Sequence, residues 1–529
     1  MRQWMVAAKK ADFYAIAEKF HVDPVVARII RNREVIGEKN IRIYLGGNLS
    51  DLSDPHQMKD MDRLVEILAQ KIRKQVHIRI IGDYDVDGVT SSHLFLTALR
   101  RVGAKVDVVI PHRIQDGYGL SLHLLQQAKE DGVDTILTCD NGIAAIDEIA
   151  WAKAQKMTVL VTDHHAVPFE EHEGRRTEKK SLADAVVNPH QQDCRYPYKE
   201  LCGAGVAWNV IRVLYENYDM DKREAEDLLD FVAMATVCDV MSLTGENRIL
   251  VKEGLKRIRH TKNIGLQALM QACNVQPENI SAYHFGYVLG PCVNATGRLD
   301  TARHALRLFE TGQETEAEEI ARDLVDLNQE RKELTLQGVE MAKKLCEEGG
   351  YEKDPVLVLF LPDVHESIAG LIAGRIREMY NRPVFVLTRG EEGVKGSGRS
   401  TENYSMYENM CGCAELFTKF GGHPMAAGLS LPEENVEKFR RKINENCPLT
   451  VEEVCPDIHI DMAMPVGYAS TELVHQFALL EPFGKDNPSP LFADRNLSIS
   501  RMWVIGKNRN VLRMSVLSEY GQPVPGIFF

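Results

Sequence analysis

The sequence predicts an α/β protein in which a parallel sheet is followed by a long helical connection, a second, smaller α/β unit and a C-terminal β barrel. From residue 76 onward, short apolar runs alternate with longer segments of helical character, the order of βαβ units around a sheet buried on both faces. The same alternation restarts near residue 354. From about residue 457, short strands separated by turns favour a small barrel.

The composition is that of a globular protein with about three domains, since 44% of the 529 residues are hydrophobic and 26% are charged. The start has no signal-peptide pattern and no apolar run approaches about 18 residues, so we expect a cytoplasmic protein that does not bind membranes. Eleven cysteines without a CxxC pair indicate reduced thiols. The net charge of −13 disfavours a general nucleic-acid binder but does not exclude a local basic groove.

Residues 1 to about 60 are expected to be helical, because an apolar stripe follows the Asp-Pro start of "DPVVARIIRNR". A helical block, beginning with "GAGVAWNVIRVLYENY", is expected after the sheet. The strands of the sheet itself are expected at VHIRIIG (76–82), KVDVVI (105–110), DTILTC (134–139), MTVLV (157–161) and DAVVN (184–188).

The second half of the chain begins with a charged, proline-free stretch, residues 301–347, which predicts a long helix or a helix pair bridging two domains. The second α/β unit starts with "DPVLVLFLP" (354–362), continues through the helix "SIAGLIAGRIREMY" and the strand "PVFVLT", and ends near residue 445. The barrel strands are expected in "DIHIDMAM", "LSISRMWVIG" and "NVLRMSV".

The first strand runs into an acidic cluster, "GDYDVDG", in which Asp83, Asp85 and Asp87 are spaced two residues apart and followed by Gly88. An EF-hand calcium loop would need a Glu at its twelfth position, which is Leu94 here, and a helix rather than a strand in front of it. We therefore reject a calcium loop and place the three carboxylates at the carboxyl end of a strand.

Two later strands also end on possible metal ligands: Asp140 follows "DTILTC", and "DHH" (163–165) follows "MTVLV". In a doubly wound sheet, ligands bind beyond the carboxyl ends of the strands. Asp239 is expected in an otherwise apolar helix, where a buried carboxylate needs a partner such as a metal. One Asp after a strand is commonly a turn or capping residue, but three successive strand ends favour a functional site.

The combination of several carboxylates with one or two imidazoles indicates a site for divalent metal ions. Hard oxygen ligands combined with histidine suit Mn²⁺ or Mg²⁺ better than a thiolate-preferring metal. Two such ions about 3.5–4 Å apart can hold the attacking hydroxide and the leaving oxygen of a phosphoester. The cluster therefore predicts two-metal phosphoester hydrolysis.

The segments "DYDVDG", "CDNG", "DHH" and "VCDVMSL" occur in the order and approximate spacing of the DHH phosphoesterase superfamily, and the whole chain resembles its RecJ family of single-stranded-DNA exonucleases. The resemblance covers nearly the whole chain. Its other segments are PHRIQDGYGL, VVNPHQ, LCGAGVAW, NATGRL, GSGRS, FGGHPMAAGLSL and LEPFGKDNPSPLF.

The resemblance implies five parts of the chain. They are an N-terminal helical segment (1–60), a DHH catalytic domain (61–300), a connecting helix (301–350), a DHH-associated substrate-binding domain (351–447) and an OB-fold-like nucleic-acid-binding domain (455–529). The chain stops at "VPGIFF", earlier than the family pattern, so we expect the barrel to be incomplete. In that barrel Trp503 is a candidate for base stacking or for the core.

The resemblance also implies roles for the acidic cluster. The implied metal ligands are Asp83, Asp85, Asp87, Asp140, His164 and Asp239. Asp140 would bridge the two ions, and Asp83, which stands where some relatives carry histidine, is either a ligand or a supporting group. Catalysis would depend on Asp140, on His165, which would activate water or stabilise the phosphorane, and on Asp163, which would orient the ligands.

Phosphate contacts are implied for both α/β units. The implied substrate-binding residues are Arg113, Arg298, Ser397, Arg399, Ser400, Gly421, Gly422 and His423. Glycines allow close backbone approach, and the other side chains donate hydrogen bonds, although any one surface arginine is more often solvated or ion-paired. Together with Arg375 they would line a basic cleft between the units. We expect His365 to be a helix-entry residue.

The predicted activity is 5′-to-3′ hydrolysis of single-stranded DNA to 5′-mononucleotides with two divalent ions, Mn²⁺ or Mg²⁺, in DNA repair and recombination. The polarity is taken from the resemblance alone. The expected partners of this monomer are single-stranded DNA, a helicase and a single-strand-binding protein. One alternative is a DHH phosphodiesterase of nano-RNA or cyclic dinucleotides, which the N-terminal block and the barrel disfavour. Another is an inactive scaffold, which the complete ligand set disfavours.

Overall fold

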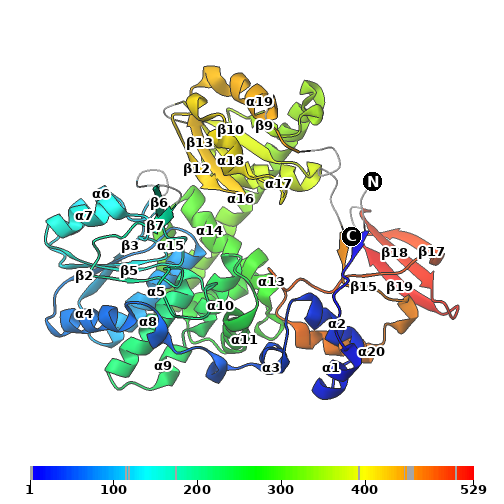
Figure 1. The fold of residues 1–529 in the computed structure, drawn as a ribbon, viewed down its shortest axis with the longest axis horizontal. Helices are drawn as coiled ribbons and strands as arrows, with labels where there is room; N and C mark the ends of the chain where they lie inside the picture. Colours follow the sequence, from blue (N-terminus) through cyan, green and yellow to red (C-terminus); the bar gives the residue numbers. More distant parts are fainter. Residues whose placement is uncertain are drawn as a thin grey trace. The chain divides into compact units, whose positions relative to one another are not determined.

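The computed structural model describes residues 4–112, 116, 119–172, 175–390, 393–445, 447–449, 458–506 and 509–529. These residues form two compact units (Figure 1). The larger unit contains Val6–Leu324 and His459–Phe529, and the smaller unit centres on Val325–Ile458. Each unit has its own five-stranded sheet and its own hydrophobic core.

The sheet of the larger unit is parallel, as predicted, with the strand order β3-β2-β4-β5-β8. Its central strands are buried on both faces, which explains why each reads as a continuous apolar run. The register aligns the carboxyl ends of neighbouring strands, since Ile81 pairs with Thr138 and Cys139 with Thr162. The strands are β2 (Ile78–Ile81), β3 (Val106–Val109), β4 (Thr135–Cys139), β5 (Thr158–Thr162) and β8 (Ala185–Val187).

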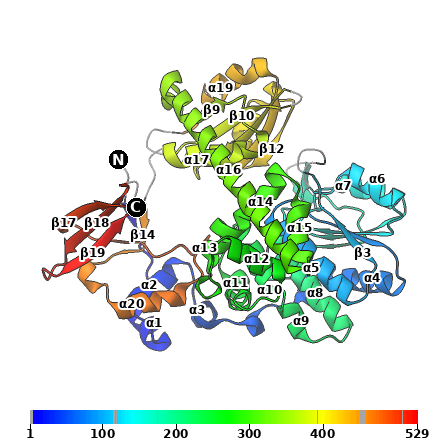
Figure 2. The same ribbon diagram turned by 180° about the vertical axis from the view of Figure 1, so that it is seen from behind.

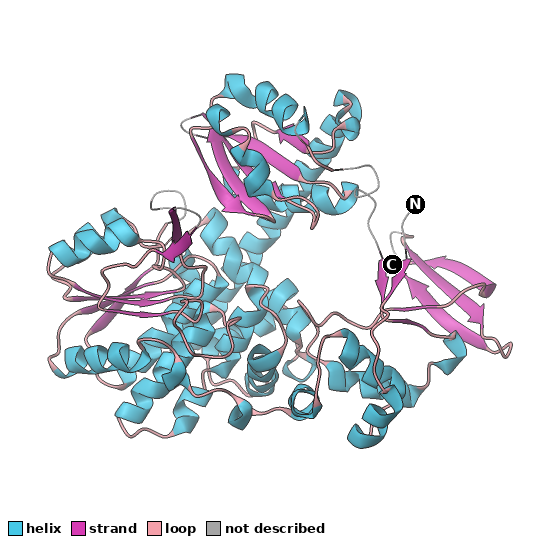
Figure 3. Cartoon of the chain, in the orientation of Figure 1, coloured by secondary structure: helices cyan, strands magenta, loops and turns pink. Residues whose placement is uncertain are grey.

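Helices cover both faces of this sheet (Figure 3). Helices α6 (Leu122–Glu130) and α7 (Ile146–Ala154) pack on one face through a core that includes Ile136 and Val159. Helices α4 (Met61–Arg73), α5 (Val86–Arg101) and α8 (Gly203–Asn217) lie on the other face. A hairpin that the sequence did not predict, β6 (Phe169–His172) with β7 (Arg175–Glu178), follows the third strand end.

A helical block follows the sheet, as predicted. Its helix α10 is buried from Leu229 to Thr236, because its sequence, LDFVAMATVC, is apolar apart from Asp230 and Thr236. A short π-helix, η4 (Phe285–Leu289), interrupts the regular helices near the end of the block. The regular helices are α9 (Lys222–Glu226), α10 (Leu229–Cys238), α11 (Gly245–Ile258), α12 (Ile264–Ala272), α13 (Ala282–His284), α14 (Gly290–Leu299) and α15 (Ala302–Glu310).

The N-terminal segment is helical as predicted, with α1 (Phe13–Phe20), α2 (Pro24–Asn32) and α3 (Glu38–Gly46), although the strand β1 (Trp4–Val6) was not predicted. These helices share one core with the C-terminal part of the chain, including α20 (Thr471–Phe477). The two chain segments were expected to be separate, because local sequence patterns contain no signal for a pairing this distant.

Buried arginines join these distant segments. Arg33 donates to both oxygens of Asp461 at 2.7 and 3.0 Å, and both side chains are buried. Arg248 is 1% exposed. It donates to the carbonyl groups of Tyr44, Leu480 and Leu479 at 2.7 to 2.9 Å. Its guanidinium therefore satisfies three carbonyl oxygens from distant parts of the chain.

Helix α16 (Glu314–Gly349) carries the chain from the larger unit into the smaller one (Figure 2). The predicted helix pair is therefore α15 and α16, separated by a short break at 311–313. The smaller unit has a mixed sheet in the order β12-β13-β11-β10-β9, with helix α17 (Glu366–Tyr380) against it. Its strands are β9 (Leu357–Phe360), β10 (Val384–Gly390), β11 (Gly393–Arg399), β12 (Lys419–His423) and β13 (Ala426–Leu431).

The C-terminal strands β17 (Ser498–Ile505), β18 (Val511–Leu517) and β19 (Pro523–Phe528) form an antiparallel meander. Within the described residues this sheet does not close into a barrel. Trp503 lies on β17 with 47% of its surface exposed, so it is not a core residue here.

Among the residues that the structure describes, no helix is both long and apolar enough to cross a membrane. Free thiols are found at Cys139, Cys194, Cys202, Cys238, Cys411 and Cys413.

Replacing Arg248 tests whether it holds the distant segments together. Arg248→Met removes the charged donor to the carbonyls of Tyr44, Leu479 and Leu480, of which, in the described part of the chain, only Leu480 keeps a hydrogen bond from Asn487, so we expect the free energy of unfolding to fall by about 2 kcal/mol or more in urea denaturation. The control is Arg100→Met, which removes an exposed ion pair with Glu310 and should cost less than about 1 kcal/mol. Equal losses in the two variants would contradict the role of Arg248.

Candidate metal centre

The acidic cluster after β2 is the start of helix α5. Asp85 caps this helix, because its side chain accepts a hydrogen bond from the amide of Gly88 at 3.0 Å. A Cβ atom at Gly88 would lie 2.5 Å from the backbone of Asp83, so this position requires glycine. Leu94 is fully buried in α5. The likeness to a calcium loop therefore comes from a strand-to-helix turn.

The carboxylate of Asp87 is bound by the first turn of another helix. Its two oxygens accept hydrogen bonds from the amides of Gly203 and Ala204 at 2.6 and 2.7 Å, at the N-terminus of α8. Gly203 also packs closely on Asp140, since a Cβ atom there would lie 2.6 Å from that side chain. The sequence offered "LCGAGVAW" only as a family-like segment, and nothing in it indicated this contact with the cluster.

The ends of β4 and β5 supply the next residues. Asp140 directly follows β4 in a left-handed conformation, with φ of 61°. Asp163 directly follows β5, and one of its oxygens accepts hydrogen bonds from the amides of His164 and His165 and from Nδ1 of His165, at 2.7 to 3.0 Å. Its other oxygen accepts from the amide of Ile143. Asp163 therefore fixes the orientation of the histidine pair.

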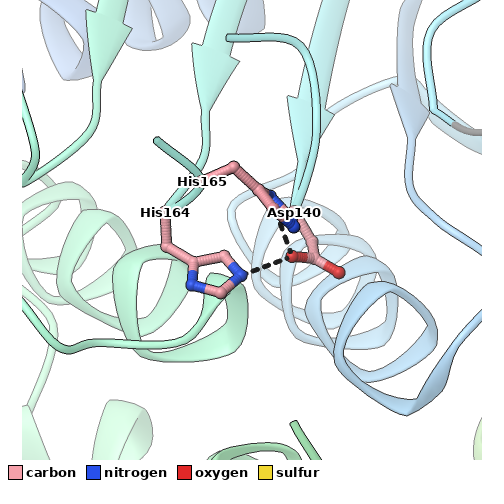
Figure 4. Close-up of side chains that lie close together, drawn as sticks. All are labelled: Asp140, His164 and His165. Atoms are coloured by element: carbon pink, nitrogen blue, oxygen red, sulfur yellow. Dashed lines mark ion pairs between the residues drawn. The ribbon is translucent and has the colours of Figure 1, made fainter. Parts of the chain in front are cut away.

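These strand ends converge around His164. Its Nε2 atom lies 3.1 Å from Asp140 Oδ1, and Figure 4 shows His165 approaching the same carboxylate. Nε2 of His164 is also 3.7 Å from Asp87 Oδ2 and 3.6 Å from Asp239 Oδ2. Three overlapping sets bring one possible ligand atom per residue within 4.8 Å of one another: Asp83, Asp85 and Asp140; Asp87, His164 and Asp239; Asp140, His164 and His165.

Asp239 does not lie inside a helix, where it was expected. Helix α10 ends at Cys238 and Asp239 is its C-cap, with 28% of the side chain exposed. The following residue, Val240, has a left-handed φ of 55°. The amide of Met241 donates to the carbonyl of Thr236, which completes a Schellman motif. The end of the helix thus turns the carboxylate toward the histidines.

Burial and mutual repulsion make the carboxylates difficult to ionise together. Burial raises the pKa of Asp140, and the charges of Asp87 and Asp85 raise it further. Burial and the charge of Asp87 raise the pKa of Asp239 to about 8. For Asp83, burial and the charge of Asp85 raise the pKa. Each of these shifts would be relieved by a nearby cation.

The pKa values of the two histidines shift in opposite directions. Burial lowers the pKa of His164, as suits an imidazole that offers a lone pair to a metal. Burial is the largest influence on His165 and opposes its charging, but the hydrogen bond to Asp163 and the charges of Asp163, Asp239 and Asp87 together raise the pKa to about 9. Both oxygens of Asp83 are buried without a well-formed hydrogen bond among the described residues. The donor set therefore fits hard divalent cations.

Two predicted phosphate-binding arginines belong to the larger unit. Arg298 lies in α14, next to Gly297, which packs on the carbonyl of Tyr84. In the same helix, the side chain of Asn294 accepts a hydrogen bond from the amide of Val86 at 3.2 Å. The "NATGRL" segment therefore packs against the acidic turn. Arg113 lies outside the described residues.

The smaller unit brings its predicted residues together at one end of the sheet. His423 on β12 and Arg399 on β11 both pair with Ala426 of the intervening strand β13. Ser397 lies two residues before Arg399 on β11. A side chain at Gly421 would meet open space. These residues leave an accessible sheet end with imidazole, hydroxyl and guanidinium groups.

Other predicted residues of the smaller unit have structural roles. The hydroxyl of Ser400 is buried and donates to the carbonyl of Tyr404 at 2.5 Å. Gly422 has a φ of 152° and packs against the backbone of Ala426, so it is required by the hairpin rather than open to a ligand. His365 is the exposed N-cap of α17, as expected. Arg375 is exposed and lies 3.5 Å from Glu378.

Three family models match separate parts of the chain. Residues 77–236 match the DHH family, N-terminal domain. Residues 353–447 match the DHHA1 domain, and residues 460–529 match the RecJ OB domain.

Solved structures show the same fold. RecJ from Thermus thermophilus in complex with Mn²⁺ matches with a TM-score of 0.81 and 26% identity, over 99% of this chain and 78% of that one. An exonuclease RecJ bound to manganese matches with a TM-score of 0.64 and 31% identity, over 75% of this chain and 96% of that one.

Two curated relatives named single-stranded-DNA-specific exonuclease RecJ match over most of the sequence. The Bacillus subtilis (strain 168) protein is 33% identical over 512 residues, and the match covers 96% of this chain but only 63% of that relative. The Haemophilus influenzae protein is 34% identical over 518 residues, covering 94% of this chain and 88% of the relative. On this evidence the chain belongs to the RecJ family of DHH proteins.

Proposed function

We propose that this protein is a single-stranded-DNA-specific exonuclease that degrades DNA in the 5′-to-3′ direction, releases 5′-mononucleotides and acts in DNA repair and recombination. The observation that carries the proposal is the convergence of three overlapping sets of carboxylates and imidazoles on the strand ends. The names of the relatives support the substrate. The polarity follows from the family resemblance.

The residues that would hold two divalent ions, Mn²⁺ or Mg²⁺, are Asp83, Asp85, Asp87, Asp140, His164 and Asp239. The Mn²⁺ and Mg²⁺ complexes of the Thermus relative support this choice of cation. Bound ions would polarise the phosphodiester and make water more acidic. Asp83 is fully buried within reach of Asp85 and Asp140, which supports a direct role as a ligand.

Two other side chains of the site, Asp163 and His165, would orient the histidine pair and bind a phosphate group of the substrate. Asp163 holds His165 through Nδ1 and so directs the opposite ring nitrogen away from itself. Without bound metal the pKa of His165 is raised to about 9, and a protonated ring would donate a hydrogen bond to a phosphate oxygen. Stabilisation of phosphoryl charge and activation of water are the two roles that we propose for His165.

We assign phosphate binding to Arg298 and Arg113 in the catalytic domain and to Ser397, Arg399 and His423 in the substrate-binding domain. Shared pairing of His423 and Arg399 with Ala426 supports a common site for the last two. The five-part division of the chain, at the boundaries given above, belongs to this proposal. So do monomeric action and cooperation with a helicase and a single-strand-binding protein.

End-labelled oligonucleotides test the activity. With Mn²⁺, we expect immediate release of the labelled mononucleotide from 5′-labelled single strands and a ladder of shortened products from 3′-labelled ones. Asp140→Ala removes a ligand shared by two of the sets and should slow release by about 100-fold or more. Asp147→Ala, an exposed carboxylate on α7, is the control. Cleavage of a cyclic dinucleotide alone, or full activity of Asp140→Ala, would overturn the proposal.

Asp163→Asn tests the orienting role. The amide cannot accept all the hydrogen bonds that the carboxylate accepts from the histidine pair, so we expect Mn²⁺ affinity or kcat to fall about 10- to 100-fold. Calorimetric titration with Mn²⁺ and single-turnover assays measure the two quantities. Asp184→Asn, which removes a carboxylate paired with Lys153 away from the cluster, should leave both unchanged.

Metal removal should make stability depend on pH in a defined direction. The pKa values of Asp239, about 8, and His165, about 9, are raised above their ordinary values, so the metal-free native state holds both protons more tightly than the unfolded chain. Their stabilisation is present at low pH and is lost as pH rises through the folded values. Histidines whose pKa is lowered by burial make stability rise with pH, but only up to their ordinary pKa of about 6.5. Above that pH they do not oppose the loss of stability.

We therefore expect the Tm in EDTA to fall between about pH 7 and 9. Mn²⁺ should reverse the fall, because it binds the deprotonated carboxylates. Asp239→Asn should flatten the dependence in EDTA, whereas Asp147→Asn should not. A Tm in EDTA that rises over this pH range would refute the electrostatic account of the site.

A further inference from the structure

A groove of about 650 Å³ lies beside the metal centre, within the larger unit. It begins at Val237 and Cys238, immediately before the candidate ligand Asp239. Its other wall is the loop 481–489, which is anchored to the helical block by a hydrogen bond from the amide of Leu243 to the carbonyl of Lys485 at 2.9 Å. The candidate ligands themselves do not line the groove, but residues on both sides of Asp239 in the sequence do, and its volume is large enough for a planar ligand.

Two tyrosines present their rings at this groove. Tyr283 and Tyr287 are 62% and 71% exposed, although large aromatic side chains usually bury more of their surface. Their rings stack on each other, with centroids 5.1 Å apart and planes inclined by 23°. Tyr287 lies in the π-helix η4, a rare geometry that is frequent at functional sites. Together the rings form an exposed aromatic surface.

Val240 adds an apolar side chain to the same groove. It occupies the position after the C-cap of α10 with a φ of 55°, where glycine is usual and a β-branched residue is strained. Burial of the side chain does not compensate for this strain, because Val240 is 62% exposed. A strained and exposed valine next to a candidate ligand indicates a contact with something outside the chain.

The charges of the groove indicate what the ligand is. Two cations, Lys485 and Arg259, and one carboxylate, Glu481, line it, and both cations are exposed without an ion-pair partner among the described residues. An aromatic surface combined with such cations is the composition of single-strand-binding grooves, in which rings stack on bases and cations contact phosphates.

We propose that Tyr283 and Tyr287, with Val240 beside them, form a stacking subsite for one or two nucleobases of the strand whose end lies in the metal centre, while Lys485 and Arg259 contact the adjoining phosphates. The proposal rests on the proposed function, since it identifies the ligand as nucleic acid. Stacking uses the flat face of a base and is indifferent to sequence. In a duplex these faces are covered by neighbouring bases, so the subsite would select single strands.

The test is binding of oligonucleotides of about 12 residues to the full chain in EDTA, which prevents cleavage. The fluorescent base 2-aminopurine is placed at each position in turn. We expect its emission to be quenched at one or two adjacent positions. Tyr283→Ala with Tyr287→Ala should abolish that quenching and raise Kd about 10-fold or more. Phenylalanine at both positions should restore both signals, and Tyr14→Ala, an equally exposed tyrosine elsewhere, should change neither.

An abasic site at the quenched position provides an independent readout. It should weaken binding to the wild-type chain but cause little further loss in the double alanine variant, because both changes remove the same contact. Val240→Gly should raise Kd without lowering Tm, since glycine relieves the backbone strain. A variant that merely unfolds would lose Tm as well.

The two proposals fail in different ways. If the wild-type chain cuts single-stranded DNA with Mn²⁺ but the alanine variant binds and quenches like wild type, the stacking subsite is wrong and the exonuclease stands. If the wild-type chain neither binds nor cuts single-stranded DNA, both proposals are overturned. If abasic and normal strands bind equally well, the groove does not take bases.

Discussion

The structure depends on one electrostatic constraint, the confinement of several carboxylates at one edge of a buried parallel sheet. Oxygens of Asp83, Asp85 and Asp140 lie within 4.8 Å of one another, a distance at which like charges in a poorly hydrated site repel strongly. The protein limits this cost by fixing the carboxylates with backbone amides: Asp87 by the start of α8, Asp85 by the start of α5 and Asp163 by the DHH turn. These amides position the oxygens but supply only partial charge, so the remaining excess of negative charge defines the need for cations.

The same constraint explains where glycine is required. Gly88 and Gly203 lie where backbone from one element touches a carboxylate residue of another, and a methyl group at either position would force the carboxylates apart. Helix α10 contributes by ending at the right residue, since its Schellman turn presents Asp239 at its end rather than burying it within the helix. The site is thus assembled mainly from the ends of elements, which explains why it draws on residues between 83 and 239.

The sheet and the strand-end ligands were predictable because their signals are local. Runs such as DTILTC indicate a strand by themselves, and a parallel sheet brings the residue after each run, such as Asp140, to a common edge. Three contacts could not be predicted this way. The amides of Gly203 and Ala204 have no side-chain signature, the burial of Ser400 depends on its own loop, and the pairing of Arg33 with Asp461 spans most of the chain. Backbone donors and distant partners leave no periodicity in a sequence.

The core shared by the N-terminal helices and the C-terminal segment has a consequence for biosynthesis. Asn32 donates to Asp461, 429 residues later in the chain. At a translation rate of about 5–20 residues per second, helix α2 would be made about 20 to 90 seconds before its partner leaves the ribosome. During that time its apolar face lacks the part of its native cover that the C-terminal segment supplies, so the nascent chain must tolerate or be shielded from early association. The order of synthesis therefore places the greatest risk of misfolding at the beginning of the chain, far from the catalytic sheet.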